Sequence, residues 1–114
     1  MEAKQFVHAL KSECKDSAVS DCVKNLTSPP GRSPADSLKE LSNWFNSLSE
    51  ADRNMVIRVM DMAADSTLFG VLCVLDGVRA IEGAGEKSSF QLIAHKGKVK
   101  TIISSGQAGL HDLL

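Results

Sequence analysis

An uncharged run between Asp65 and Asp76 constrains the fold of this chain more than any other feature. Apolar side chains dominate the run, and Gly77 follows it directly after Asp76. On a helix these side chains point in nearly every direction, and a helix that is apolar on all sides belongs in the interior of a protein. The sequence therefore predicts that this run forms the covered centre of a compact fold.

The run is predicted to be the last part of a long helix. Ser49 is suited to be its N-cap, with Asp52 three residues later in a loose capping-box arrangement. Apolar residues then recur at helical spacing as far as Leu75, and Gly77 is suited to cap the C-terminal end. A buried β-strand over residues 71–75 is the alternative, because periodicity alone does not assign a short apolar run.

Two more helical segments are predicted before this helix. Apolar residues recur at helical spacing from Glu2 to Leu26, and the polar middle at Lys15–Ser17 leaves open whether this segment is one long helix or two short ones. Two prolines and a glycine at 29–31 end it, because proline lacks an amide donor and fixes φ. The next helix is predicted to begin at Ser33 as N-cap, with Pro34 in its first position.

The C-terminal part of the chain is predicted to form a β-hairpin. Apolar and polar residues alternate over 90–103, and a two-residue turn at Lys96 and Gly97 aligns the apolar positions across the two strands. One face then holds Phe90, Leu92, Ala94, Val99, Thr101 and Ile103. The other face holds Gln91, Ile93, His95, Lys98, Lys100 and Ile102. The second face is mixed in character, so it is expected to meet solvent or a partner.

Together these elements define the predicted fold: one α+β domain over residues 1–114, mostly helical, with a buried central helix and a C-terminal two-stranded antiparallel hairpin. A length of 114 residues and a hydrophobic content of 43% suit a single domain with its own core. A two-stranded sheet is marginal alone, so we expect its apolar face to lie against the helices. The tail Leu110–Leu114, after Gly106 and Gly109, is apolar enough to dock back onto the domain.

The charge, the cysteines and the N-terminus exclude several classes of function. A net charge of −1 provides no overall field that would attract nucleic acid or an anionic membrane surface. The N-terminus lacks the basic start and apolar stretch of a secretory signal. The longest uncharged run is about half of the roughly 20 residues that a membrane-spanning helix needs. Three cysteines, an odd number, make a poor disulfide framework, so we expect a reducing, cytoplasmic setting.

No motif predicts a catalytic centre, a cofactor site or a metal site. The loop from Gly83 to Ser88 lacks the glycine directly before lysine that a phosphate-binding loop needs. The histidines and cysteines lack the short spacing of a zinc site. Cys14 and Cys22 lie eight residues apart on one face of a continuous helix, and we expect them to be small buried hydrophobes. Cys73, inside the uncharged run, is expected in the core.

The best polar candidates are Asp76, Arg79 and Glu82, because they follow the uncharged run and are expected at the rim of the core. The simpler interpretation is structural: Asp76 accepts backbone hydrogen bonds in the turn before Gly77 and pairs with Arg79. The functional alternative is a small-molecule-binding protein or a small enzyme whose pocket lies where Asp76 and Arg79 meet His95.

The favoured hypothesis is a non-catalytic protein-binding module. Trp44 and Phe45 are adjacent and point about 100° apart on a helix, so one ring stays exposed and can anchor a partner. The residues assigned to partner binding are Trp44, Ile93, His95, Lys98, Lys100 and Ile102. The expected partner is another protein or a second copy of this chain, as in a homodimer. Nucleic acid is not expected, because the outer hairpin face carries no aromatic ring that would stack on a base.

Three segments carry a resemblance to other chains. They are Trp44–Leu48, Leu68–Glu82 and Leu110–Leu114. With these segments the chain resembles small bacterial domains of unassigned function, and stand-alone chains of this type sometimes resemble immunity or accessory proteins that act by binding one other protein. The resemblance implies protein binding in a bacterial cytoplasm and assigns no site residue.

Overall fold

The computed structural model describes residues 1–104 and 109–114. The elements are α1 (Ala3–Leu10), the π-helical segment η1 (Lys11–Asp16), α2 (Ser17–Thr27), α3 (Asp36–Ser47), α4 (Glu50–Leu75), β1 (Leu92–Lys96), β2 (Val99–Ser104) and the short 3₁₀ helix η2 (Leu110–Leu113). The two strands pair as an antiparallel hairpin. The fold is therefore of the predicted α+β class, mostly helical with a C-terminal hairpin.

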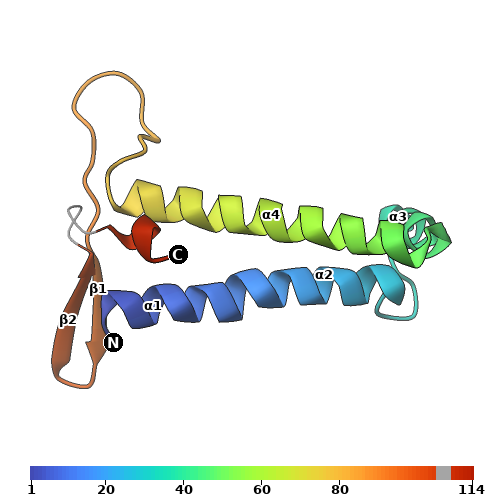
Figure 1. The fold of residues 1–114 in the computed structure, drawn as a ribbon. Coiled ribbons are helices and arrows are strands. Elements are labelled where there is room, and N and C mark those ends of the chain that lie inside the picture. Colours follow the sequence, from blue (N-terminus) through green and yellow to red (C-terminus); the bar gives the residue numbers. More distant parts are fainter. Residues whose placement is uncertain (105–108) are drawn as a thin grey trace.

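The segments α1, η1 and α2 form one continuous helix, which we call the N-terminal rod, and α4 runs back antiparallel along it (Figure 1). The sequence left open whether the polar middle of the rod breaks the helix. The backbone stays helical there but widens into π-helix over Lys11–Asp16. A π segment accommodates local strain without ending a helix, and such segments are frequent at functional sites.

Both predicted ends of α4 are confirmed. The Ser49 hydroxyl accepts a hydrogen bond from the Asp52 amide at 3.1 Å, as an N-cap does. Beyond the last helical residue, Gly77 has a φ of 76°, the left-handed conformation that glycine adopts after a helix. Residues 71–75 are helical, so the alternative of a strand in this run is wrong.

Helix α3 begins two residues later than predicted. Its N-cap is Ala35 instead of Ser33, and the backbone of Ala35 is extended, with a ψ of 145°. Pro34 therefore lies outside the helix, and Asp36 takes the first helical position. A carboxylate in the first turn interacts favourably with the positive end of the helix dipole, which supports this start.

The register of the hairpin also differs from the predicted one. Ala94 pairs with Thr101, where the prediction paired it with Val99. The turn consists of Gly97 and the residue after it, and Gly97 has a φ of 60°. A type II′ turn needs such a φ at its first central position, and the predicted turn would have placed Lys96 there. From Ile93 to Lys96 the pairing shifts by two residues, so these residues and their partners keep their predicted faces. The register is irregular between Leu92 and Ile93, and Leu92 pairs with Ser104, three residues from its predicted partner Thr101.

The structure has two small cores at opposite ends of the rod. At the hairpin end the buried residues are Val7, Leu72, Ile103 and Leu110, which come from α1, α4, β2 and η2. The hairpin and the tail from Gly109 onward therefore dock on the helices as predicted, while Gly106 lies outside the described residues. At the other end, the core contains Leu26 of α2 and Phe45 of α3. The hydroxyl of buried Ser42 donates to the Leu26 carbonyl at 2.5 Å, which ties α3 to the end of the rod.

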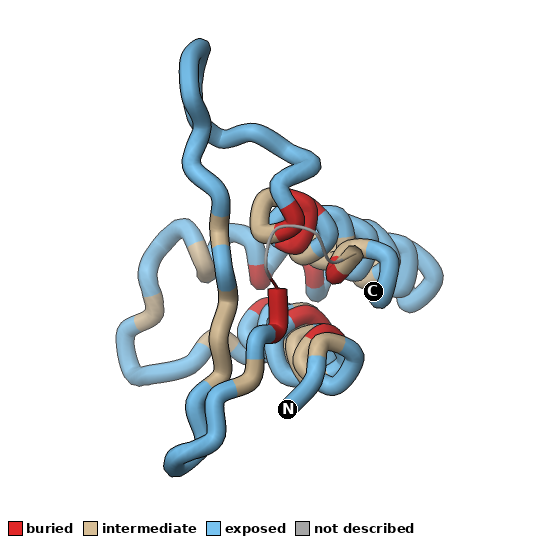
Figure 2. Tube along the Cα trace, turned by 90° about the vertical axis from the view of Figure 1, so that its left-hand side faces the viewer, coloured by how far each residue is buried: buried red, intermediate tan, exposed pale blue. Residues whose placement is uncertain are grey.

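A single chain is elongated and leaves much of its surface exposed (Figures 1 and 2). Its radius of gyration is 18.4 Å, against about 13 Å for a compact domain of this length. Its accessible surface is 8059 Å², about 2,000 Å² more than a compact monomer of 12.2 kDa exposes.

The uncharged run is not covered on all sides within one chain. Leu72 and Cys73 are buried, but Phe69 is 39% exposed and Val71 is 51% exposed. The physical reason is that the N-terminal rod lies along one side of α4 only.

Candidate protein interface

The acidic side chains in the middle of α4 face the N-terminal rod. Asp61 and Asp65 lie 3.5 Å and 3.1 Å from the ammonium nitrogen of Lys15, whose side chain is only 8% exposed. The hydrogen bond to Asp65 raises the pKa of Lys15, against the opposing effect of desolvation. These two carboxylates of α4 therefore balance the positive charge of the Lys15 ammonium between the two long helices.

Apolar side chains of α4 point away from the rod and into solvent. Their spacing alternates between four and three residues, which places them on one face of the helix. They are Met55, Val59, Met62 and Phe69, with Ser66 at the remaining position of the pattern. We call these five residues the α4 stripe. The exposed fractions are 56% for Met55, 59% for Val59 and 64% for Met62. Phe69 is 39% exposed, because its ring also meets that of His111. This is the reverse of an ordinary surface helix, which turns its apolar face inward.

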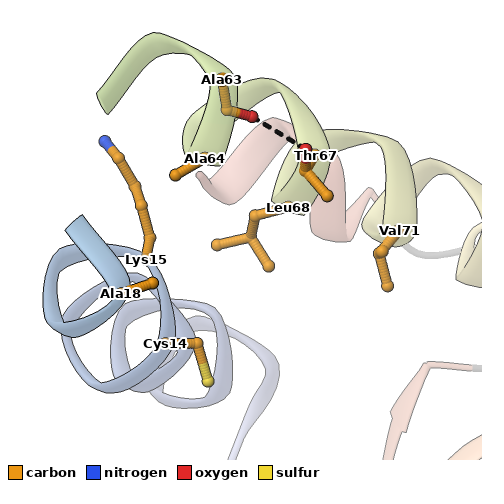
Figure 3. A pocket seen from close by; sticks show the side chains of 8 residues that line it. All are labelled: Cys14, Lys15, Ala18, Ala63, Ala64, Thr67, Leu68 and Val71. Carbon is orange, nitrogen blue, oxygen red and sulfur yellow. Dashed lines mark hydrogen bonds between the residues drawn. The ribbon is translucent and has the colours of Figure 1, made fainter. Parts of the chain in front are cut away.

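A second exposed apolar surface lies between α4 and the rod. It is an open cavity of about 410 Å³, which we call the inter-helix groove (Figure 3). Its lining residues are Cys14, Lys15, Ala18, Ala63, Ala64, Thr67, Leu68 and Val71. Most of these side chains are small or apolar, and Figure 3 shows the Lys15 chain extending along one end. The groove lies on a different side of α4 from the stripe, so α4 presents uncharged residues over a wide arc.

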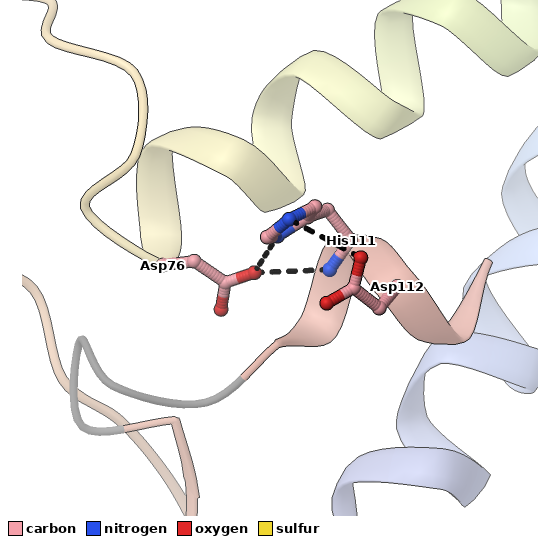
Figure 4. A network of polar contacts seen from close by, with 3 residues as sticks. All are labelled: Asp76, His111 and Asp112. Carbon is pink, nitrogen blue, oxygen red and sulfur yellow. Dashed lines mark hydrogen bonds and ion pairs between the residues drawn. The ribbon is translucent and has the colours of Figure 1, made fainter.

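Asp76 is buried and holds the C-terminal helix η2 in place (Figure 4). Its Oδ2 atom accepts a hydrogen bond from the His111 amide at 2.9 Å and lies 2.5 Å from His111 Nδ1. The imidazole also meets the Phe69 ring edge-on, with 5.6 Å between centroids. Among the described residues, Oδ1 of Asp76 has no hydrogen-bond partner. The predicted pairing with Arg79 is wrong, because the tail supplies a closer partner from a distant part of the chain.

The three residues of the alternative pocket lie in separate surroundings. The Arg79 guanidinium covers Gly70, so that a Cβ built at Gly70 would stand 2.4 Å from its Nη1 atom. Arg79 also lines a cavity of about 70 Å³ beside the loop that follows α4. His95 is exposed on β1 and lines a different cavity with Met1, of about 550 Å³. Asp76 contacts His111, so the structure does not bring the three together in one of these sites.

The residues assigned to partner binding lie on α3 and on the hairpin. Trp44 is 51% exposed, and the adjacent Phe45 is buried at 2%, so one of the two rings is exposed as expected. Ile102 is 56% exposed and pairs with Ile93, which is half-buried. The remaining members, His95, Lys98 and Lys100, are exposed.

Sequence reasoning missed the α4 stripe, although its spacing was visible. The periodicity of Met55, Val59 and Met62 predicts helix and does not assign a covered face. Periodicity shows that a face is apolar, but it does not show what covers it. The same limit explains the cysteines: Cys14 and Cys22 are exposed, which contradicts the predicted burial, and Cys14 lines the open inter-helix groove. Cys73 is buried, as predicted.

Within residues 1–104 and 109–114, no three or more histidine, cysteine or carboxylate side chains are placed to hold a metal ion. In the same part of the chain, no helix combines the length and the apolar character needed to cross a membrane. Comparison of the chain with protein-family models, with curated proteins and with solved structures found no match.

Proposed function

We propose that this chain is a non-catalytic protein-binding module that contacts its partner through the α4 stripe and the inter-helix groove. One observation carries the proposal: the acidic residues Asp61 and Asp65 of α4 face the neighbouring rod, while Met55, Val59 and Met62 face solvent. Apolar surface gains about 25 cal/mol for each Å² removed from water, so a partner that covers this face is stabilised by it.

The shape of the surface supports this proposal. A ridge of large side chains and a groove lined mostly by small or apolar ones, here on different sides of α4, are each surfaces on which a helix of another protein can pack. Contiguous apolar surface is rare on proteins that act alone, and it marks sites of protein contact. Trp44 and Ile102 are the members of the originally assigned set whose large apolar side chains are most exposed, and we propose them as secondary contacts.

A cytoplasmic location is part of the proposal. Cys14 and Cys22 are free and exposed, and Cys73 is free and buried. Exposed thiols persist unpaired in a reducing compartment, whereas an oxidising one favours disulfides.

Site-specific photo-crosslinking in cells tests the proposal. A photoreactive amino acid in place of Met62, on the α4 stripe, is expected to form a covalent adduct with a protein that mass spectrometry then identifies. The matched control is the same amino acid in place of Asp36, whose side chain is fully exposed on α3. Equal adducts from both positions, or none from either, would count against a binding surface on α4.

A further inference from the structure

We infer that the partner of the α4 stripe is a second copy of this chain, with the two α4 helices antiparallel across a twofold axis near Met62. This inference rests on the proposed function, because it names the occupant of the same surface.

The pattern of the stripe is that of a helix that pairs with another helix. Apolar residues at alternating intervals of four and three form the a and d positions of a heptad repeat. The stripe from Met55 to Phe69 extends over 15 residues, or about 21 Å of helix axis. A face of this length accommodates about two turns of knobs-into-holes packing on each side of a central axis.

The exposed area is sufficient for a stable dimer. A standard interface removes about 800 Å² from each partner. The surface excess of one chain, about 2,000 Å² over a compact monomer of its mass, exceeds this amount. A second copy that forms an interface of standard size on the stripe would remove about two-fifths of this excess, which belongs to the whole chain.

The charges beside the stripe favour the antiparallel orientation. Arg58 and Asp65 flank the same side of the stripe, four residues before and three residues after Met62. The Asp65 side chain pairs with Lys15 of its own chain, but it is still 47% exposed. In an antiparallel twofold pair, the side of one α4 that carries Arg58 and Asp65 faces the same side of the other α4, so each Arg58 lies opposite Asp65 of the second copy. In a parallel pair, these two sides lie on opposite sides of the interface and do not meet. Within its own chain Arg58 contacts Met55 Sδ at 3.5 Å, and among the described residues it forms no ion pair.

The net charge of each chain is compatible with self-association. At −1 per chain, two copies repel each other only weakly. A twofold contact uses the same patch on both chains. Both stripes are therefore covered in the dimer, and no stripe remains to bind a third chain.

The first experiment measures mass by light scattering behind a sizing column. The wild type is expected at twice the chain mass of 12.2 kDa. The variant Val59→Glu with Met62→Glu is expected at the mass of one chain with its helical circular dichroism retained. The control Val78→Glu with Ile81→Glu changes two similarly exposed apolar residues in the loop after α4 and is expected to remain a dimer. A monomeric wild type, or dissociation by the control alone, overturns the inference.

A milder variant keeps the test decisive if the double glutamate variant fails to fold. Met62→Gln preserves the length of the side chain and adds no charge. Loss of apolar burial at the centre of the interface is expected to raise the dimer dissociation constant, measured by sedimentation, about tenfold for each of the two substituted chains. An unchanged dissociation constant would place the contact elsewhere.

Cysteine crosslinking determines the orientation. The background carries Cys14→Ser and Cys22→Ser, which removes the two exposed thiols. In this background Met55→Cys is expected to link to a chain that carries Phe69→Cys, and not to another Met55→Cys chain. A parallel pair would instead link Met55→Cys to itself, which would overturn the antiparallel arrangement.

The two proposals fail in distinguishable ways. If the wild type is a monomer and photo-crosslinking at Met62 captures a different protein, the second copy is refuted and the binding module stands. If the wild type is a monomer and position 62 gives no more adduct than the Asp36 control, both proposals fail.

Discussion

Lys15 of the N-terminal rod and Asp65 of α4 form an ion pair, with 3.1 Å between the ammonium nitrogen and a carboxylate oxygen. The lysine lies in the π-helical segment, and Asp61 is a second carboxylate at 3.5 Å. The pair lies between the two small cores of the molecule. It fixes the rod against α4 in a region where large apolar contacts are few.

The first prediction concerns the pH dependence of this ion pair. The folded-state pKa of Lys15 is raised above the ordinary value of 10.5, chiefly by the hydrogen bond to Asp65. Its contribution to stability is therefore complete below pH 10.5 and is lost as the pH rises through the folded-state pKa. In urea titrations between pH 8 and pH 12, the free energy of unfolding of Lys15→Met should fall less steeply with pH than that of the wild type. Lys11→Met, an exposed lysine one turn earlier, should follow the wild type. Parallel curves for Lys15→Met and the wild type would contradict the ion pair.

The second prediction concerns the attachment of the C-terminal helix. Removing the imidazole that contacts buried Asp76 with His111→Ala should lower the free energy of unfolding by about 1.5–3 kcal/mol, the range for hydrogen bonds to a charged group. Amide exchange at Leu110 should accelerate, because only the backbone amide of residue 111 then still attaches η2 to Asp76. Asp112→Asn is the control, since the Asp112 side chain is 76% exposed, and it should change stability by less than about 0.5 kcal/mol. Equal effects of the two variants would show that Asp76 does not hold η2.

The third prediction concerns Gly70 in the interior of α4. A methyl group there would meet the Arg79 guanidinium at 2.4 Å, but this is the end of a flexible side chain that can move into solvent. Alanine is favoured over glycine inside a helix, so Gly70→Ala should raise the free energy of unfolding by about 0.5–1 kcal/mol. The same gain is expected in an Arg79→Ala background. A much larger gain in that background would mean that Arg79 is held over Gly70 and resists displacement.

The fourth prediction tests the hairpin register. Gly97 has a φ of 60°, which costs a residue with a side chain about 1–2 kcal/mol. Gly97→Ala should therefore destabilise the hairpin and broaden the NMR signals of residues 92–104. Gly83→Ala, in the loop after α4, meets no atom within 4 Å and should leave stability unchanged. If Gly97→Ala is harmless, the glycine does not occupy the first central position of the turn.

The sequence was most informative where a local backbone conformation needs one particular type of residue. Ser49 and Gly77 marked both ends of α4 correctly, because a cap hydroxyl and a left-handed glycine are local needs. The hairpin and its faces were also predictable, since alternation has a period of two residues. Its register was not, because that depended on whether Gly97 is the first or the second residue of the turn.

Contacts between segments that are distant in the chain could not be predicted from the sequence. Lys15 lies in a polar stretch, and its burial depends on Asp61 and Asp65, which follow it by more than 40 residues. The partner of Asp76 is likewise 35 residues away in the tail. The helical spacing of the α4 stripe is visible in the sequence, but a sequence pattern does not separate a face covered by the same chain from one that is left exposed.

The π-helical segment sets the angular phase of the N-terminal rod. Val7 and Leu26 serve the two cores and are 19 positions apart, which on an uninterrupted α-helix would place their side chains about 100° apart around the axis. A π turn advances fewer degrees per residue, so Lys11–Asp16 rotates the second half of the rod back towards the face of the first. One helix can thus serve two cores on the same side without a break in the chain.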